Sequence, residues 1–381
     1  MAIDWIVVGA GFTGATFAQR MAAAGKRVLL IERRDHVGGN AFDDQNERGI
    51  VVHRYGPHIF HTNSDVVWSY LSNFTEWRPY EHRVLALVEG KLVPIPFNLN
   101  SLAALFPTQL AERIENALIV QYGFGKRIPI LKLRESKDTA IREFADYVYR
   151  NVFEGYTIKQ WQLRPEELNP SVTARVPVSI GRDDRCFQDV YQAIPLHGYA
   201  AMFRRMLDHP NIEIMLGCDW KDSVSRAAGA RIFFTGAINE FLDYRFGPLA
   251  YRSIRFEERT LEETQHQPVG TMNYPNNYDY TRVTEQKIIT GQQAAVTTLI
   301  TEYPQPHEPG TTIAYYPIPR TENHSLYVKY ASVAQAEFPN VCFAGRLGDY
   351  QYYNMDQACA RALKIASECG AGDWRLSPAV G

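Results

Sequence analysis

The chain has 381 residues, a formal net charge of −2 and a hydrophobic fraction of 45%, which predict two or three domains and give no basis for nucleic-acid binding by bulk attraction. No apolar run reaches the roughly 18 residues that a membrane span needs, and we expect no secretory signal before the first strand. The five cysteines are scattered without a CxxC pair, which indicates a reducing cytoplasm rather than a disulfide framework or a zinc site.

The chain opens with a β-α-β unit. Residues 6–8 form a short β-branched run that ends in glycine and predicts a buried parallel strand. Residues 16–24 are good helix formers that stop at Gly25, and residues 27–32 predict a second strand. The crossover between two such strands is expected to be right-handed.

The turn between the first strand and the helix fits GxGxxG and reads Gly9-Ala10-Gly11-Phe12-Thr13-Gly14. In this context the motif is typical of dinucleotide binding. The first glycine permits the tight turn, the second lets the backbone approach a pyrophosphate, and the third permits close helix–strand packing. The helix N-terminus then receives the negative charge. Glu32 ends the second strand and is expected to accept hydrogen bonds from the adenosine ribose.

The cofactor is predicted to be FAD. Glu32 is followed by Val37-Gly38-Gly39-Asn40, and an acid followed by a Gly-Gly loop is typical of flavoproteins of the glutathione-reductase-like class. A late Gly345-Arg346 pair before a helix near Asp356 is the second half of that pattern, and the helix could direct its N-terminus at the pyrimidine end of the flavin. No second strand-anchored GxGxxG indicates a separate nicotinamide-binding fold.

Later segments return to the first sheet. Residues 231–236 and 341–345 predict two more strands, and a helical stretch follows from about 356 to 369. Between them lie two insertions. The first, 98–187, is helical in pattern, with candidate helices at 102–105, 110–121 and 139–152. The second, 242–315, is rich in Thr, Tyr and Val with period-two stretches such as 294–303, which predicts antiparallel sheet.

The predicted fold class is therefore α/β, with a discontinuous Rossmann-like FAD-binding domain, an inserted helical domain and an antiparallel sheet domain. The FAD-binding domain is assigned to 1–80, 198–241 and 316–381, the helical domain with a mobile lid loop to 98–187, and the sheet domain to 81–97, 188–197 and 242–315.

Six further motifs run through nearly the whole chain. They are Tyr55-Gly56-Pro57-His58-Ile59-Phe60-His61-Thr62, Gly155-Tyr156-Thr157-Ile158-Lys159-Gln160-Trp161, Met272-Asn273-Tyr274, Tyr280-Thr281-Arg282, Tyr315-Tyr316-Pro317 and Gly345-Arg346-Leu347-Gly348. In these motifs and their order the chain resembles the UDP-galactopyranose mutase family. The resemblance implies a flavin domain, a helical domain and a six-stranded antiparallel sheet.

The resemblance also implies the chemistry. Family members are isomerases that convert a nucleotide-diphospho-pyranose, most often UDP-galactopyranose, to the furanose form used in cell wall biosynthesis. FAD is active when reduced: its N5 attacks the anomeric carbon and expels the nucleoside diphosphate, with no net electron transfer. The expected partner is a nucleotide sugar, with no nucleic acid and no membrane span, and the expected assembly is a homodimer or higher homo-oligomer.

Site residues follow from the same resemblance. Those implied to bind cofactor are Gly9, Gly11, Phe12, Thr13, Gly14, Glu32, Arg33, Gly39, Asn40, His58, Ile59, His61, Arg346, Tyr353, Met355 and Asp356. Those implied to bind substrate are His82, Val152, Tyr156, Thr157, Trp161, Arg182, Cys186, Asn273, Arg282, Tyr316 and Tyr352. Arg282, Arg346, His61 and Tyr352 are the expected catalytic residues.

Four positions depart from the bacterial pattern. The lid loop, which usually reads Val-Pro-Val-Arg, reads Val176-Pro177-Val178-Ser179; Cys186 replaces a tyrosine, His82-Arg83 replaces Asn-Arg, and Asn354 replaces an aspartate. The loop still carries Arg182 and Arg185. Because the leaving diphosphate needs a cation, we expect Arg182, or failing that Arg185, to take over the closing role.

Three alternatives stay open from the sequence. The same chemistry could act on dTDP-fucopyranose or UDP-N-acetylgalactosamine. A conventional FAD oxidoreductase, or a flavin-binding protein without catalysis, would share the flavin domain.

The trio His53, His58 and His61 could suggest a metal, but no carboxylate cluster accompanies it, and no metal is expected.

Overall fold

The computed structural model describes residues 2–169, 177–223 and 229–372. Two compact units make up the chain, and each is assembled from separate segments. Unit 1 consists of Met1–Tyr80, Asp189–Tyr251 and Glu322–Gly381, and unit 2 consists of Glu81–Gln188 and Arg252–Thr321. The division into three domains remains a prediction.

Unit 1 is built on a five-stranded parallel sheet in the order β12-β2-β1-β13-β19. Its strands are β1 (Trp5–Val8), β2 (Val28–Glu32), β12 (Ile212–Leu216), β13 (Arg231–Phe234) and β19 (Val341–Phe343). The predicted strands at 6–8, 27–32, 231–236 and 341–345 are therefore confirmed, while β12 was not predicted. β1 and β2 are buried along their whole length, as expected of parallel strands covered on both faces.

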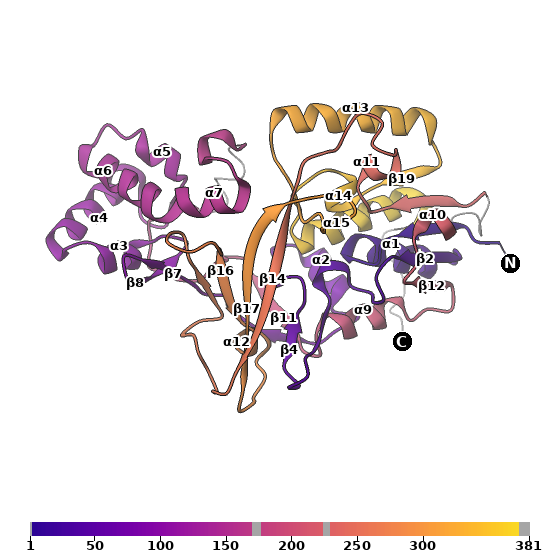
Figure 1. The fold of residues 1–381 in the computed structure, drawn as a ribbon, viewed down its shortest axis with the longest axis horizontal. Helices are drawn as coiled ribbons and strands as arrows, with labels where there is room; N and C mark the ends of the chain where they lie inside the picture. Colours follow the sequence, from indigo (N-terminus) through magenta and orange to yellow (C-terminus); the bar gives the residue numbers. More distant parts are fainter. Residues whose placement is uncertain (1, 170–176, 224–228, 373–381) are drawn as a thin grey trace. The chain divides into compact units, whose positions relative to one another are not determined.

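Helices and small sheets complete unit 1 (Figure 1). The helices are α1 (Phe12–Ala23), α2 (Asp65–Leu71), α9 (Tyr199–Leu207), α10 (Trp220–Ser223), α11 (Ile238–Phe241), α13 (Thr321–Glu337), α14 (Gly345–Gly348) and α15 (Met355–Ala366), with a 3-10 turn η1 (Gly39–Ala41) and a π-helical turn η5 (Ser367–Ala371). The small sheets pair β3 (Asp43–Gln45) with β4 (Val51–His53), and β11 (Tyr191–Pro195) with β5 (Phe60–Thr62) and β6 (Trp77–Pro79).

The core of unit 1 joins α1 to segments from the end of the chain. Phe17 of α1 stacks on Phe233 of β13 with ring centroids 3.8 Å apart, and buried residues of α15 such as Cys359 and Ala362 belong to the same cluster. The discontinuous architecture predicted from the sequence is therefore confirmed for this unit.

The first part of unit 2 is mainly helical. The helices are α3 (Leu99–Leu105), α4 (Thr108–Tyr122), α5 (Ile130–Arg134), α6 (Thr139–Val148) and α7 (Gly155–Trp161), with a short strand pair of β9 (Arg127–Ile128) and β10 (Val178–Ser179) and a 3-10 turn η3 (Pro165–Glu167). Asn98 caps α3 and Asp138 caps α6 by accepting backbone N–H bonds. The predicted helix at 139–152 is α-helical only to Val148, and a π-helix, η2 (Tyr149–Glu154), continues into α7.

The sheet of unit 2 corrects the prediction. Seven strands, not six, lie in the order β18-β14-β17-β16-β15-β7-β8, and β15 pairs with β7 in parallel. They are β18 (Tyr316–Pro317), β14 (Tyr251–Leu261), β17 (Thr297–Pro306), β16 (Arg282–Glu285), β15 (Thr271–Asn273), β7 (Val84–Val88) and β8 (Lys91–Ile95); the short helix α12 (Gln286–Thr290) follows β16. The sheet is mixed because the β7–β8 hairpin comes from a distant chain segment and joins the edge beside β15.

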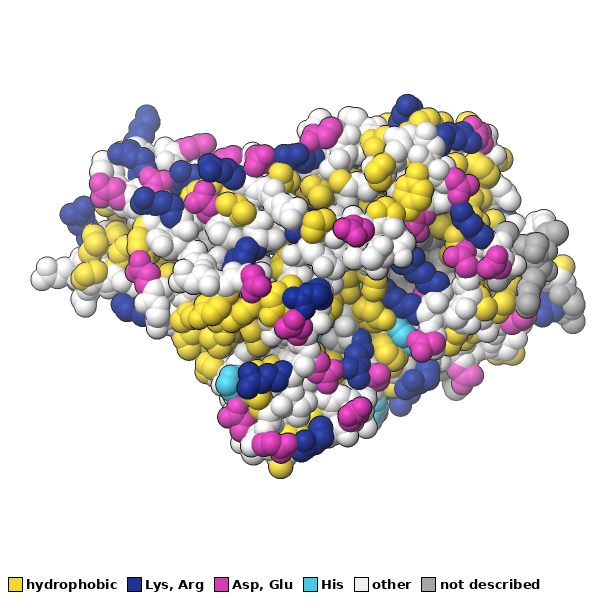
Figure 2. All heavy atoms as spheres, viewed as in Figure 1, with side chains coloured by type: hydrophobic (Ala, Val, Ile, Leu, Met, Phe, Trp, Pro, Cys, Tyr) yellow, Lys and Arg dark blue, Asp and Glu magenta, His cyan; other side chains and the backbone are white. Residues whose placement is uncertain are grey.

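Within the described part of the chain, no helix is both long and apolar enough to cross a bilayer. The same residues contain no group of three or more His, Cys, Asp or Glu side chains placed to hold a metal. Acidic and basic side chains are intermixed over the face shown in Figure 2, in keeping with the net charge of −2.

Candidate functional site

The glycine turn after β1 forms a close-packed cradle in unit 1. A Cβ on Gly14 would lie 1.8 Å from Gly9 O, and a Cβ on Gly39 would lie 2.8 Å from Gly11 Cα. Gly11 is the N-cap of α1 without a side-chain cap, and the first turn has no acidic residue. The first turn of α1 therefore has N–H groups without a side-chain cap, which is the feature that a pyrophosphate site requires.

The carboxylate of Glu32, which is predicted to bind the adenosine ribose, is held in place at the end of β2. Its Oε2 accepts the Ala10 N–H at 2.8 Å and its Oε1 accepts the Arg34 N–H at 3.0 Å, so two backbone bonds fix the carboxylate. Asn40 Oδ1 accepts a bond from Arg34 Nη2 at 2.8 Å. Arg33 is exposed, and no contact of its side chain supports its predicted cofactor role.

Arg346 is held at the other end of the predicted cofactor site. Its Nη2 donates to Tyr353 O at 2.7 Å, and its guanidinium lies 5.5 Å from the centroid of the Tyr352 ring. Asp356, in the first turn of α15, accepts a bond from Thr62 Oγ1 at 2.9 Å, which joins α15 to β5. Met355 is the first residue of α15.

The histidine motif provides a neutral imidazole. His58 Nδ1 lies 2.7 Å from Gly56 O, and the His58 N–H donates to His53 Nδ1 at 3.0 Å. Burial, with His53 beside it, lowers the pKa of His58 to about 3, and burial lowers the pKa of His53 to about 4. Both rings are therefore uncharged at neutral pH, and Ile59 beside them is buried.

His61 forms a dyad with a carboxylate that the sequence analysis did not single out. Asp189 Oδ2 accepts a bond from His61 Nδ1 at 2.9 Å, and Asp189 Oδ1 accepts a bond from Asn63 Nδ2 at 2.8 Å. A carboxylate can only accept, so His61 carries a proton on Nδ1. His61 lies on β5 and Asp189 lies just before β11. Because the two residues are far apart in the sequence, the sequence analysis did not connect them.

Arg282 begins β16 in unit 2 and is held on two sides. Its Nη2 donates to Tyr156 Oη at 3.0 Å, and its Nε lies 3.2 Å from Glu302 Oε2. Asn273 on β15 and Glu302 on β17 are its direct cross-strand neighbours, so the three side chains share one face of the sheet. The structure therefore brings together Arg282, Asn273 and Tyr156, which were predicted in three separate motifs.

Glu302 is a second residue that the sequence analysis missed. It is 2% exposed, and among the described residues its Oε1 has no hydrogen-bond partner. Burial raises the pKa of Glu302, while Arg282 acts in the opposite direction. The period-two pattern of its strand was the available signal, because it places a carboxylate on the inner face.

Cys186 lies close to the same arginine. Its N–H donates to His82 O at 2.7 Å. Burial raises the pKa of the Cys186 thiol to about 11, with Arg282 and Arg127 opposing. Cys186 is thus an uncharged thiol where the family pattern has a phenol, and His82 is buried beside it.

The remaining substrate candidates lie on η2, α7 and β18. Val152 is buried in the π-helix η2, Thr157 follows Tyr156 on α7, and the rings of Trp161 and Tyr316 have centroids 6.1 Å apart. Single π-helical turns are common at functional sites because they redirect side chains within a helix.

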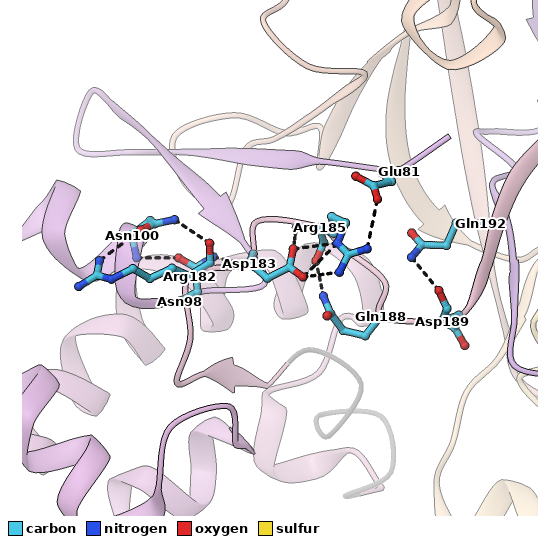
Figure 3. Close-up of polar contacts among 9 residues, drawn as sticks. All are labelled: Glu81, Asn98, Asn100, Arg182, Asp183, Arg185, Gln188, Asp189 and Gln192. Carbon is cyan, nitrogen blue, oxygen red and sulfur yellow. Dashed lines mark hydrogen bonds and ion pairs between the residues drawn. The ribbon is translucent and has the colours of Figure 1, made fainter. Parts of the chain in front are cut away.

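The two lid arginines are engaged in ion pairs, and Figure 3 shows those of Arg185 with Asp183 and Glu81. Arg182 Nη2 donates to both carboxylate oxygens of Glu115, at 2.8 and 2.7 Å. Arg185 pairs with Asp183 at 2.6 Å and with Glu81 at 3.2 Å. A closing role for either would require it to leave these partners, and that role remains a prediction. Val176 of the predicted lid motif lies outside the described residues.

The predicted residues divide between the two units. All cofactor candidates and Tyr352 belong to unit 1, and the other substrate candidates belong to unit 2. Unit 1 thus offers a dinucleotide cradle with an oriented imidazole. Unit 2 offers a fixed guanidinium beside phenol and indole rings, a set suited to a diphosphate and a base or sugar.

Comparison with known proteins identifies related chains. A family model described as UDP-galactopyranose mutase matches residues 151–352, and one described as an NAD(P)-binding Rossmann-like domain matches residues 7–74. A probable UDP-galactopyranose mutase of Klebsiella pneumoniae is 36% identical over 365 residues, covering 95% of this chain and 94% of the relative. A dTDP-fucopyranose mutase of Escherichia coli is 34% identical over 369 residues, covering 95% and 97%.

Solved structures share the fold. A crystal structure of reduced UDP-galactopyranose mutase superposes with a TM-score of 0.73 at 16% identity, covering 97% of this chain and 95% of the other. A cyclohexylamine oxidase from Brevibacterium oxydans gives a TM-score of 0.55 at 13% identity, covering 97% and 100%. At these identities the structural likeness concerns the fold alone.

Proposed function

The chain belongs to the UDP-galactopyranose mutase family, and from this membership we propose that it converts UDP-galactopyranose into UDP-galactofuranose. The observation that carries the substrate class is Arg282, held between the Tyr156 hydroxyl and the buried Glu302 carboxylate. A guanidinium fixed in this way is preorganised for a diphosphate, because it needs no reorientation when negative charge develops there.

FAD is the proposed cofactor, and the residues of unit 1 fit it. The Gly9–Gly14 turn leaves no space for a side chain at two positions, Glu32 is fixed at the end of β2, and α15 begins beside Arg346 and Tyr353. When bound and reduced, FAD supplies a nucleophilic nitrogen for the anomeric carbon of the sugar.

The side chains have separate tasks in this proposal. Arg282 neutralises the diphosphate as its bond to the anomeric carbon breaks, and Tyr156 donates or accepts a hydrogen bond beside it. The indole of Trp161 and the ring of Tyr316 provide apolar surface that excludes water from the sugar. His61, held by Asp189, keeps one defined tautomer and can hold or release a proton at Nε2 during ring opening and closure.

A second substrate, dTDP-fucopyranose, has a specific observation in its favour. The Escherichia coli relative named for that substrate is nearly as similar as the Klebsiella pneumoniae one, at 34% against 36% identity. Both substrates contain a nucleoside diphosphate on the anomeric carbon, so Arg282 serves either.

We place the activity in the cytoplasm, which the five free cysteines support.

Turnover by the reduced holoprotein tests the proposal. The purified protein is reduced with dithionite and offered UDP-galactose, dTDP-fucose and UDP-N-acetylgalactosamine in turn. We expect furanose product from the reduced protein only, without net consumption of reductant. Steady consumption of oxygen or NAD(P)H without sugar isomerisation would instead identify a conventional oxidoreductase, and conversion of dTDP-fucose alone would select the second substrate.

A further inference from the structure

Lys159 on α7 donates hydrogen bonds to three backbone carbonyl groups of a single loop. Lys159 Nζ donates to Tyr278 O at 2.9 Å and to Tyr280 O at 3.0 Å, and it also donates to Tyr274 O. An ammonium group has three N–H donors, so these three acceptors use all of them. The loop of residues 274–280 is thereby folded around one half-buried charge.

This loop connects two residues of the nucleotide-sugar site. It leaves β15 after Asn273 and enters β16 at Arg282. Lys159 itself lies on α7, the helix that carries Tyr156. Lys159 therefore links the loop that ends at Arg282 to the helix that carries Tyr156. Arg282 and Tyr156 are the donor and the acceptor of one hydrogen bond.

Two further contacts tie the same loop to η2 and to the start of α7. Asn276 Nδ2 donates to Asn151 O at 2.8 Å. A Cβ on Gly155 would lie 2.5 Å from Pro275 O, so the loop backbone packs directly on the helix. Lys159 supplies the only charge among these three ties, and it is the one that contacts both halves of the loop.

We propose that Lys159 is a positioning residue of the nucleotide-sugar site, because its ammonium group holds the loop of residues 274–280 against α7 and so sets Arg282 opposite Tyr156. The inference rests on the proposed function, since it concerns the affinity of the same site for a nucleotide sugar. Lys159 touches neither diphosphate nor sugar in this role and acts through Arg282.

The chemistry of the three carbonyls favours lysine at this position. The donors of an ammonium point in three tetrahedral directions, whereas those of a guanidinium lie in one plane. Lys159→Arg therefore keeps the charge but cannot reproduce the three bonds. Lys159→Met keeps the unbranched stem and removes all three.

The protonation state of Lys159, and with it the three hydrogen bonds to the loop, depends on pH. Burial lowers the pKa of Lys159 to about 8, and the charged group acting against this shift is Asp279 on the same loop. Tyr280 and Tyr274 do not titrate in that range, because burial raises the pKa of Tyr280 to about 12 and raises that of Tyr274. Above pH 8 the amine has two N–H groups for three carbonyls, and the loop is held less firmly.

Binding of UDP-galactose to the oxidised holoprotein tests the proposal without turnover. We expect Lys159→Met and Lys159→Arg to weaken binding by about tenfold, or about 1.4 kcal/mol, with unchanged FAD content. Lys132→Met, which alters an exposed lysine of α5 in the same unit, should bind as the wild type does. In the wild type, affinity should fall between pH 7 and pH 9 with a midpoint near 8, whereas Lys159→Met should show no such midpoint.

Each outcome separates the inference from the function beneath it. Wild-type affinity for UDP-galactose in a well-folded Lys159→Met protein overturns the positioning role alone. A wild-type protein that binds no nucleotide sugar overturns the proposed function and this inference with it. Should Lys159→Met fail to fold, the pH profile of the wild type decides: affinity that is flat from pH 7 to pH 9 overturns the role, and a midpoint near 8 supports it.

Discussion

Arg282 illustrates how one residue acquires a function from its neighbours. Tyr156 and Glu302 hold its guanidinium from a helix and from the adjacent strand. We predict that Arg282→Lys lowers kcat/KM of the reduced enzyme by about tenfold to a hundredfold. The planar guanidinium can bond Tyr156, Glu302 and a diphosphate at once, whereas the ammonium group of lysine cannot. FAD content should not change. Arg255→Lys, at an exposed arginine of β14, is the matched control; equal losses in both variants would contradict a special role for Arg282.

Glu302 should make stability depend on pH in a defined direction. Burial raises its pKa, so the folded protein holds this proton at pH values where the unfolded chain has lost it. The stability that this carboxyl contributes is therefore present below its unfolded-state pKa and is lost as pH rises through the folded pKa. Glu302→Gln cannot ionise. We predict that the free energy of unfolding of the wild type falls relative to that of this variant as pH rises from 5 to 8.

Thermal unfolding from pH 5 to pH 8 checks this prediction. The Tm of the wild type minus that of Glu302→Gln should fall as pH rises, because only the wild type loses stability from this group. Glu258→Gln, at an exposed glutamate of the neighbouring strand β14, should show a constant difference. A gap that widens with pH would mean that the carboxylate form of Glu302 is the favoured one.

Asp189 is expected to affect turnover through its hydrogen bond with His61. Replacing it by asparagine keeps the shape but removes the negative charge that holds the Nδ1 proton. We predict for Asp189→Asn a mixture of imidazole tautomers in the nitrogen-15 spectrum of His61 and a loss of turnover of roughly tenfold or more. Asp65→Asn, which alters a carboxylate bonded to Tyr191 Oη, should leave both unchanged. An unaltered His61 spectrum in Asp189→Asn would refute the orienting role.

At the scale of elements, the glycine turn before α1 separates folding from cofactor binding. A Cβ on Gly14 would meet Gly9 O at 1.8 Å, whereas a Cβ on Gly11 would lie 3.7 Å from Gly39 Cα. We predict that Gly14→Ala destabilises the apoprotein by about 1–3 kcal/mol. Gly11→Ala should leave the Tm of the apoprotein unchanged but reduce bound FAD, because the methyl group occupies the path of the pyrophosphate. Full FAD content in Gly11→Ala would show that the cofactor does not approach this turn.

The elements that the sequence predicts are those whose patterns are local. The first strand, helix and second strand follow from an apolar run, a glycine turn and a second apolar run, and they form as predicted. The helix α13 was missed because only Tyr330 and Ala334 of its residues are buried, so no apolar stripe marks it. The parallel pairing of β15 with β7 joins strands from residues 84–88 and 271–273, which no local pattern encodes.

The same reasoning explains the site residues. Arg282, Tyr156 and Asn273 were identified through motifs, and the structure brings them together on adjacent elements. Asp189 and Glu302 were not, because a carboxylate gains its role from a cross-strand or cross-sheet partner rather than from its own sequence context. The lid arginines show the converse: their spacing suggested a phosphate role, and the structure gives them carboxylate partners.

For the whole molecule, the division into two units predicts separate responses to ligands. Each unit has its own hydrophobic core, one around α1 and α15 and the other around α4 and α6. We predict that adding FAD to the apoprotein slows hydrogen exchange mainly in unit 1, and that adding UDP-galactose slows it mainly in segments 151–161 and 271–285 of unit 2. Uniform protection across both units by FAD alone would show that the units do not respond separately.

The late position of β19 has a consequence for synthesis on the ribosome. The glycine turn and Glu32 are made long before residues 341–343, which give β13 its outer neighbour. Until then the flavin sheet presents β13 as an open edge, the kind of surface that pairs with other chains. Arg346 and α15 emerge later still. Nascent chains truncated after residue 321 should therefore carry no flavin and should depend on chaperones, whereas synthesis of residues 341–366 should permit both sheet closure and cofactor loading.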